Sequence, residues 1–214
     1  TRRSRFDPSS GMSRLVTEKV TKAEATQRMG RAGRTNTGVC YKLWTKGEDG
    51  GLTPFPEPEI LISDLSPLAM ELAAWGVNNP ENLPFLTHPK SLDFQTAQEL
   101  LKNLGAINDK GNITELGQKI SREPTHPRLA RILIAGGLDA NLVVALIESK
   151  DILGPNAPID FKLRMDAIKN SISFENDYPY TINKTASSNV LKLSKRLHSK
   201  GQLELSYSQM AAIA

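Results

Sequence analysis

Residues 47–58 divide this sequence into two regions of different character. The segment holds three glycines and three prolines. Proline lacks a backbone donor and glycine adds backbone freedom, so neither a long helix nor a central strand can cross it. Strand and turn patterns dominate before it, and short helical patterns follow it. We therefore expect a mostly α-helical protein with a small α/β portion at its start.

Composition narrows the class of protein further. The 214 residues are 39% hydrophobic and 23% charged, which is typical of globular domains. The single cysteine, Cys40, cannot form an internal disulfide, and three scattered histidines argue against a structural zinc site. We predict no metal site. No apolar run reaches the roughly 18 residues of a transmembrane helix, and no signal-peptide pattern opens the chain. We expect a cytoplasmic protein without membrane contacts.

The formal net charge of +4 is unevenly distributed. Residues 1–50 contain 11 Lys and Arg against 5 Asp and Glu, whereas residues 51–110 contain 3 against 8. A basic segment beside an acidic one favours a phosphate-bearing partner, either a nucleotide or a nucleic acid. The alternative is a chance fluctuation in solvated charges.

The basic region contains three expected elements. Residues 2–6 and 12–20 flank a cluster of turn formers and predict a β-hairpin. No domain start precedes it, so we expect the chain to open partway through a domain. Thr21 and Glu24 have the spacing of a capping box, which predicts a helix over 22–32. The β-branched and aromatic residues at 39–45 predict a strand.

The middle of the chain has the pattern of a winged helix. Ser66 followed by Pro67 predicts the start of a helix over 68–75, and a second helix is expected over 94–104. A turn at 108–111 between two short apolar segments predicts a small wing, and Thr114 then begins another helix that runs to about 122. Beyond it, four expected helices form a small bundle: 127–135, 139–149, 160–172 and 187–200. Loops are expected at 155–158 and 175–179.

The most informative stretch is residues 27–34, Gln-Arg-Met-Gly-Arg-Ala-Gly-Arg. On a continuous helix, Gln27, Arg31 and Arg34 would lie within about 60° of one face. Gly30 and Gly33 would each cost such a helix about 1 kcal/mol relative to alanine. Two guanidiniums and an amide suit a polyphosphate, because the guanidiniums neutralise phosphate oxygens and the amide can orient a water. A solvated basic helix end, or non-specific nucleic-acid contact, is equally compatible with the pattern.

These eight residues resemble motif VI, Q-R-x-G-R-x-G-R, of the superfamily 2 DEAH-box helicases at every fixed position. Residues 38–44 resemble a strand of the same family, and the run 68–76 is most like the bacterial HrpB-type helicases. Three other segments resemble the helicase-associated region that follows in the family: 97–106, 112–117 and 126–129.

The resemblance implies the C-terminal part of an ATP-dependent RNA or nucleic-acid helicase. Residues 1–50 would be the end of the second RecA-like domain, residues 51–122 a winged-helix domain, and residues 123–214 a ratchet-like helical bundle. Arg31 and Arg34 match the arginine fingers at the γ-phosphate of ATP, and Gln27 matches the glutamine that positions the attacking water. Arg28 would make a structural ion pair.

The 214 residues contain no G-x-x-x-x-G-K-(S/T) motif and no D-E-x-H motif. ATP and Mg²⁺ would therefore be bound mainly by an upstream RecA-like domain of the same parent chain, and we expect these residues alone to be inactive.

Single-stranded nucleic acid, RNA in the first place, is the partner that the resemblance implies. The expected contacts are hairpin and bundle arginines: Arg3, Arg5, Arg14, Arg128 and Arg131. For the bundle pair, an ion pair with Glu123 is an equal alternative. We interpret the basic residues Lys192, Lys195, Arg196 and Lys200 as a solvated face, and Trp44 and Trp75 as core residues.

A non-catalytic winged-helix regulator of nucleic acid is the alternative function. Such a regulator needs a helix that reads bases, and the expected helix over 94–104 lies in a net acidic segment. This charge argues against duplex binding by the winged-helix module.

Overall fold

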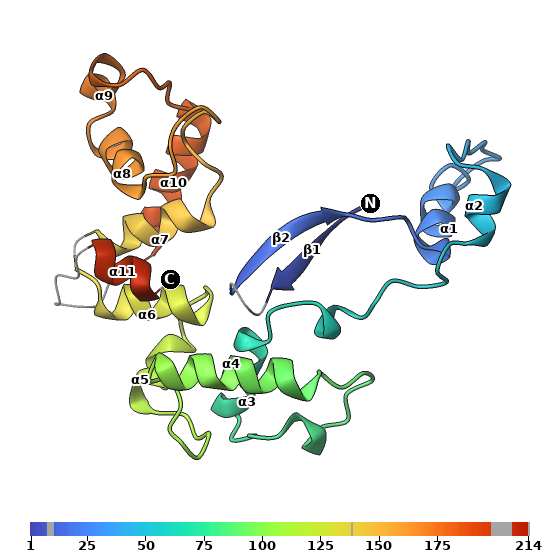
Figure 1. The fold of residues 1–214 in the computed structure, drawn as a ribbon, viewed down its shortest axis with the longest axis horizontal. Helices are drawn as coiled ribbons and strands as arrows, with labels where there is room; N and C mark the ends of the chain where they lie inside the picture. Colours follow the sequence, from blue (N-terminus) through green and yellow to red (C-terminus); the bar gives the residue numbers. More distant parts are fainter. Residues whose placement is uncertain (8–10, 138, 198–206, 214) are drawn as a thin grey trace. The chain divides into compact units, whose positions relative to one another are not determined.

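The computed structural model describes residues 1–7, 11–137, 139–197 and 207–213. The chain forms two compact units, one of residues 1–72 with 77–100 and the other of residues 73–76 with 101–214. As expected, the described elements are mostly helices, with one two-stranded antiparallel sheet (Figure 1).

The sheet of the first unit is the expected hairpin. β1 (Arg2–Asp7) pairs with β2 (Met12–Thr17), with Arg2 opposite Thr17 and Arg5 opposite Arg14. The predicted turn residues 8–10 lie outside the described residues, and β2 ends three residues earlier than expected. The Phe6 N–H donates to the Ile62 carbonyl at 3.1 Å, which ties the hairpin to η1 (Glu59–Leu61).

α1 (Lys22–Gly30) begins where the capping box predicts. The N–H groups of its first four residues are all satisfied. The carbonyls of Thr53 and Pro54 accept the first two, and the side chain and carbonyl of Thr21 accept the next two. Glu24 completes the box by accepting from the Thr21 N–H at 2.9 Å. The start of α1 is therefore held by the glycine- and proline-rich segment.

The predicted strand over 39–45 is wrong, because residues 39–45 have no strand in the structure. Val39, Tyr41 and Leu43 are 73%, 85% and 94% exposed. A strand requires a neighbour for its backbone hydrogen bonds, and the described residues provide none beside this segment. α2 (Lys46–Gly50), capped by Thr45, follows inside the segment expected to be an irregular linker.

The winged-helix elements are α3 (Ser66–Ala74), α4 (Ser91–Asn103) and α5 (Glu115–Ile120), with η2 (Pro80–Asn82) between the first two. Ile107 and Ile113 form the expected wing as an antiparallel bridge. Gly76 and Gly105 follow α3 and α4 with φ of +80° and +72°, a conformation that favours glycine at helix ends.

Three details of this region differ from expectation. Ser66 is the first residue of α3 rather than its cap, and its N–H donates to Asp64 Oδ1 at 2.8 Å. α4 begins three residues earlier than predicted. Trp75 is 71% exposed rather than core, because it follows the last residue of α3.

The other tryptophan, Trp44, precedes α2. It is half-buried and donates from Nε1 to Asp49 Oδ1 at 2.8 Å.

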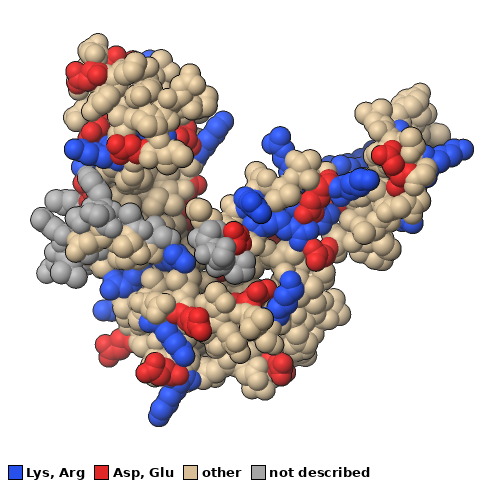
Figure 2. Space-filling model, viewed as in Figure 1, with Lys and Arg blue, Asp and Glu red and all other residues tan. Residues whose placement is uncertain are grey.

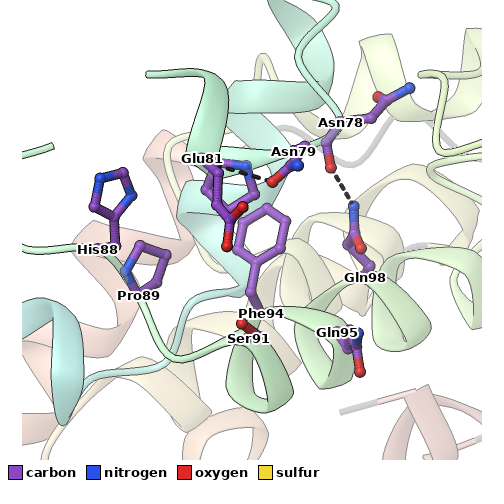
Figure 3. A pocket seen from close by; sticks show the side chains of 10 residues that line it. Asn78, Asn79, Glu81, His88, Pro89, Ser91, Phe94, Gln95 and Gln98 are labelled. Carbon is purple, nitrogen blue, oxygen red and sulfur yellow. Dashed lines mark hydrogen bonds between the residues drawn. The ribbon is translucent and has the colours of Figure 1, made fainter. Parts of the chain in front are cut away.

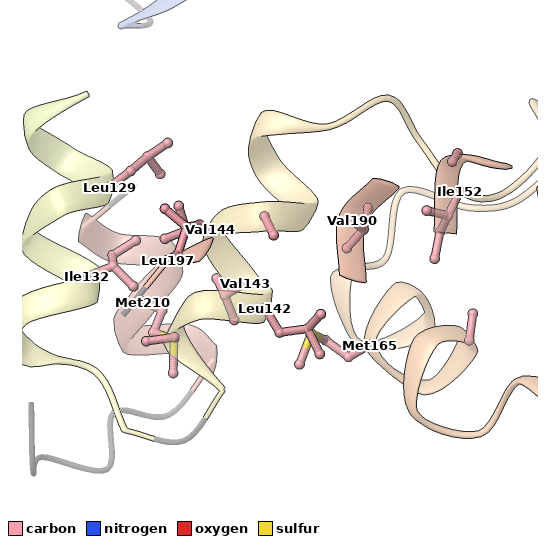
Figure 4. Packing of buried hydrophobic residues seen from close by; sticks show 14 of the residues in the cluster. Leu129, Ile132, Leu142, Val143, Val144, Ile152, Met165, Val190, Leu197 and Met210 are labelled. Atoms are coloured by element: carbon pink, nitrogen blue, oxygen red, sulfur yellow. The ribbon is translucent and has the colours of Figure 1, made fainter. Parts of the chain in front are cut away.

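Within the described residues, six helices of the second unit follow α5: α6 (Pro127–Ala135), α7 (Ala140–Glu148), α8 (Phe161–Lys169), α9 (Ser171–Asp177), α10 (Lys184–Arg196) and α11 (Tyr207–Ile213). Side chains from all of them form one apolar core (Figure 4). Ile132, Val144, Met165, Phe174 and Val190 are at most 1% exposed there.

The expected helix over 160–172 is two helices. Asn170, with φ of −128° and ψ of 45°, separates α8 from α9, and α9 extends into the predicted loop at 175–179. Asparagine is a weak helix former, so the chain can turn there and bring Phe174 into the core. α10 begins three residues before the expected start, with Asn183 as its cap. Its predicted end at Lys200 lies outside the described residues.

Candidate functional site

The motif at residues 27–34 spans the end of α1. Gln27 lies in the last turns of α1, and Arg31 is its C-cap with helical φ and ψ of −69° and −29°. The N–H of Arg31 donates to the carbonyl three residues back, as does that of Ala32, so the helix tightens and stops. Gln27 and Arg31 therefore share a helical face as predicted. Arg34 follows in a turn, and the prediction of one face for all three is wrong.

Arg31 and Arg34 are exposed and have no side-chain partner within the described part of the chain. Two guanidiniums close in sequence repel each other unless an anion lies between them. Arg28 differs, because its Nη2 donates to Thr1 Oγ1 at 3.1 Å. Within the described residues Arg28 thus has a hydroxyl partner in place of the expected ion pair, and the two matched finger positions remain open to a ligand.

Three of the four hairpin arginines, Arg3, Arg5 and Arg14, are predicted nucleic-acid contacts, and their environments differ. Arg3 Nη2 lies 2.7 Å from Glu24 Oε2, and its side chain is 13% exposed. Arg5 Nε donates to Glu18 Oε1 at 2.7 Å, and Arg5 also pairs with Glu57. Of these three, only Arg14 is exposed without a side-chain partner in the described hairpin, and Arg2, which was not among the predicted contacts, is exposed as well. Figure 2 shows Lys and Arg side chains gathered over the hairpin.

Two carboxylates beside Arg3 and Arg5, those of Glu18 and Glu24, are stabilised in their charged form by hydrogen bonds. The hydrogen bond from Arg5 lowers the pKa of Glu18, and the Thr21 N–H lowers the pKa of Glu24. The same contacts with Glu18 and Glu57 raise the pKa of Arg5. This cluster of Arg3, Arg5, Glu18 and Glu24 was not predicted from the sequence. Alternation along β1, which puts Arg3 and Arg5 on one face, was the available signal.

In the bundle, Arg128 and Arg131 are half-buried on α6. They lie three residues apart, on a helix whose Leu129, Ile132 and Leu133 enter the core. His126 is the N-cap of α6, and its Nδ1 accepts from the Arg128 N–H at 3.2 Å. Arg128 lies one turn before the buried Ile132, so its side chain leaves α6 at the edge of the core face.

A polar pocket of about 300 Å³ lies between η2 and the first turns of α4 (Figure 3). Gln98 Nε2 donates to the Asn78 carbonyl at 3.0 Å, and Asn79 Oδ1 accepts from the Glu81 N–H at 3.0 Å. Its polar groups therefore hold the loop before α4 in place. Among the lining residues, Glu81 adds negative charge and His88 is exposed. Because Glu81 would repel negative charge, this pocket does not suit a polyanion.

Two further findings concern the described residues. They contain no group of three or more His, Cys, Asp or Glu side chains that could hold a metal ion. None of their helices has both the length and the apolar character needed to cross a membrane.

Comparisons with known proteins agree with the motif. The family model of the helicase-associated domain (HA2), winged-helix, matches residues 97–122. The ATP-dependent RNA helicase HrpB of Escherichia coli is 37% identical over 155 residues, which cover 70% of this chain and 19% of HrpB. The pre-mRNA-splicing factor ATP-dependent RNA helicase prp22 of Schizosaccharomyces pombe is 38% identical over 130 residues, 60% of this chain and 11% of that protein.

Two crystal structures of E. coli HrpB cover 99% of this chain at 32% identity, with TM-scores of 0.65 and 0.68. They are described as a DExH-box NTPase and a DEAH/RHA helicase, and the chain spans 24% and 25% of them. These relatives favour the helicase interpretation over the winged-helix regulator. The motif at residues 27–34, the helicase-associated winged helix and these similarities together place the chain in the DEAH-box helicase family.

Proposed function

We propose that the full-length protein containing this chain is an ATP-dependent RNA helicase and that residues 1–214 are part of its C-terminal half. The observation that carries the proposal is the pair of exposed, unpartnered guanidiniums of Arg31 and Arg34 within a complete motif VI. Relatives of this chain, which spans less than a fifth of their length, are named ATP-dependent RNA helicases and give independent support.

ATP hydrolysis divides between this chain and an upstream RecA-like domain. That domain would hold ATP and Mg²⁺. ATP would supply the phosphoryl group, and Mg²⁺ would balance part of the negative charge of the phosphates. Arg31 and Arg34 neutralise the charge on the γ-phosphate oxygens, a role that suits free guanidiniums. The Gln27 amide, on the same helical face as Arg31, orients the attacking water.

The proposed domains are 1–50, 51–122 and 123–214. In the first, the apolar side chains of Val39, Tyr41 and Leu43 are uncovered within the described residues. These residues are a surface against which the upstream part of the second RecA-like domain packs.

Single-stranded RNA binds through its phosphates, without dependence on sequence. Arg14, Arg128 and Arg131 are the proposed contacts in this chain, whereas Arg3 and Arg5 pair with carboxylates. A cytoplasmic location completes the proposal, supported by the single cysteine, Cys40.

The full-length protein tests the proposal directly. We expect Mg²⁺-dependent ATP hydrolysis that single-stranded RNA stimulates, and ATP-dependent separation of an RNA duplex with a single-stranded tail. Single-stranded DNA of the same sequence, assayed in parallel, determines whether the substrate is RNA alone. A full-length protein that binds duplex nucleic acid but hydrolyses no ATP would instead support the regulator.

A further inference from the structure

One carboxylate oxygen joins the β-hairpin to α1. Glu24 Oε2 accepts from the Thr21 N–H at 2.9 Å and from Thr21 Oγ1 at 3.0 Å, which caps the helix. The same atom lies 2.7 Å from Arg3 Nη2 on β1. The side chains of Arg3 and Glu24 are only 13% and 24% exposed, so solvent screens the pair less than a fully exposed one.

This contact ends a series of alternating charges. Arg3 Nε lies 3.5 Å from Glu18 Oε2, Glu18 Oε1 accepts from Arg5 Nε at 2.7 Å, and Arg5 pairs with Glu57. Four of the five charged residues lie outside α1: Arg3 and Arg5 lie on β1, Glu18 directly follows β2, and Glu57 lies in the segment at 47–58. Glu24 alone lies on α1. Arg3 is therefore the member of the series that connects the hairpin to the helix.

α1 has little apolar packing of its own. Ala25 is its one buried residue, and its first turn is held by hydrogen bonds to Thr21, Thr53 and Pro54. Polar contacts at the first turn, together with the contact of Arg28 with Thr1 in the last turn, therefore decide how the helix is oriented. Because α1 is nine residues long, a change at Glu24 is carried to Gln27 and Arg31 within two turns.

Building on the proposed function, we propose that Arg3 is a positioning residue for ATP hydrolysis. Through Glu24 it fixes the orientation of α1 relative to the hairpin, so RNA held at the hairpin places Gln27 and Arg31 for the reaction. Arg3 itself touches neither ATP nor RNA in this arrangement. The Arg3–Glu24 pair is a link between the nucleic-acid surface and the arginine fingers.

Steady-state ATP hydrolysis by the full-length protein, with saturating single-stranded RNA and without RNA, tests the link. We expect Arg3→Gln and Glu24→Gln each to lower the RNA-stimulated kcat at least tenfold. The RNA-free kcat and the KM for ATP should stay within twofold of wild type. Glutamine at position 24 retains an oxygen for the Thr21 N–H, so the cap survives and only the charge is lost. The double variant should be no worse than either single variant, since the pair acts as a unit.

Arg164→Gln is the matched control. Arg164 pairs with Asp151 at the same 2.7 Å and is also 13% exposed, but it lies in the other unit. It should keep RNA stimulation. Full stimulation in Arg3→Gln, additive losses in the double variant, or equal loss of RNA-free and RNA-stimulated rates would each overturn the link. A wild-type protein without RNA-stimulated hydrolysis would refute the proposed function instead.

Discussion

Arg5 and Arg14 lie directly opposite each other across the hairpin, yet only Arg5 is paired with carboxylates. Like charges at directly opposed positions destabilise a sheet, and Glu18 and Glu57 remove that cost from one side only. Arg14 on β2 therefore presents a positive charge that no carboxylate neutralises within the described residues, while the opposing strand β1 is held by the ion pairs of Arg5. Such a site suits a phosphate.

We predict that Arg14→Ala weakens RNA binding by the full-length protein in a salt-dependent way. Each phosphate contact to a single strand contributes about 0.7 to the slope of log affinity against log salt, so the slope should fall by about that amount. Arg128→Ala combined with Arg131→Ala should reduce it further. Fluorescence titration of a labelled RNA at several salt concentrations measures both. An unchanged slope in the double variant would mean that the bundle arginines make no phosphate contact.

Arg31→Ala and Arg34→Ala should each abolish ATP hydrolysis by the full-length protein while nucleotide binding persists. Arginine fingers act on charge in the transition state and contribute about 10³–10⁵ in rate. The loss should therefore appear in kcat rather than KM. Lysine should rescue poorly, because it lacks the bidentate fork of arginine. Arg28→Ala is the control, since it removes only the contact with Thr1 and should preserve most of kcat. A near-normal kcat in Arg31→Ala would contradict the assignment.

Purified residues 1–214 should hydrolyse no ATP. The phosphate-binding loop and the metal-binding carboxylates that phosphoryl transfer requires are absent from these residues. A coupled assay with Mg²⁺ and RNA measures the rate, and full-length protein provides the positive control. Magnesium-dependent turnover by these residues alone would mean that they contain a nucleotide site of their own.

Acid should destabilise the second unit through Asp151. Its pKa is lowered chiefly by the hydrogen bond from Arg164, so the folded state binds that proton less readily than the unfolded state. The resulting stability is present above the unfolded pKa of about 4 and is lost as the pH falls below it. Thermal unfolding between pH 7 and pH 3 should show a smaller acid-induced fall in Tm for Asp151→Asn than for wild type. Asp109→Asn, in the wing turn, should follow wild type.

Gly117→Ala should destabilise the winged helix. A Cβ at residue 117 would lie 2.0 Å from the Ala106 carbonyl oxygen and 2.8 Å from Ile113 Cγ1, so the wing must move away from α5. Overpacking of this kind costs about 1–3 kcal/mol, which chemical denaturation measures. Gly154→Ala is the matched control, because nothing lies within 4 Å of its Cβ position. Equal stability of the two variants would contradict the close approach.

Local chemistry predicted the elements that depend on a few neighbouring residues. Thr21 with Glu24 marked the start of α1, Gly105 marked the end of α4, and Pro127 marked the start of α6. The motif residues were likewise identified from a contiguous run. Their arrangement was only partly predictable, because the end of α1 at Gly30 depends on how the following turn closes.

Other features depend on contacts between distant residues. The break at Asn170 lets Phe174 enter a core built from helices on both sides of it, which periodicity alone cannot reveal. The pairing of Arg3 with Glu24 joins β1 to α1, which are separated in the sequence by the hairpin turn, β2 and the N-cap of α1. The strand over 39–45 was predicted from propensity, but propensity does not supply a hydrogen-bonding neighbour.

The exposed row of Val39, Tyr41 and Leu43 also has a practical consequence. An uncovered apolar segment with β propensity is a template on which another copy of the same chain can stack. Residues 1–214 prepared alone should self-associate as their concentration rises, and light scattering would show it. Replacing Tyr41 and Leu43 with lysine would keep such a preparation monodisperse without touching the motif or the winged helix.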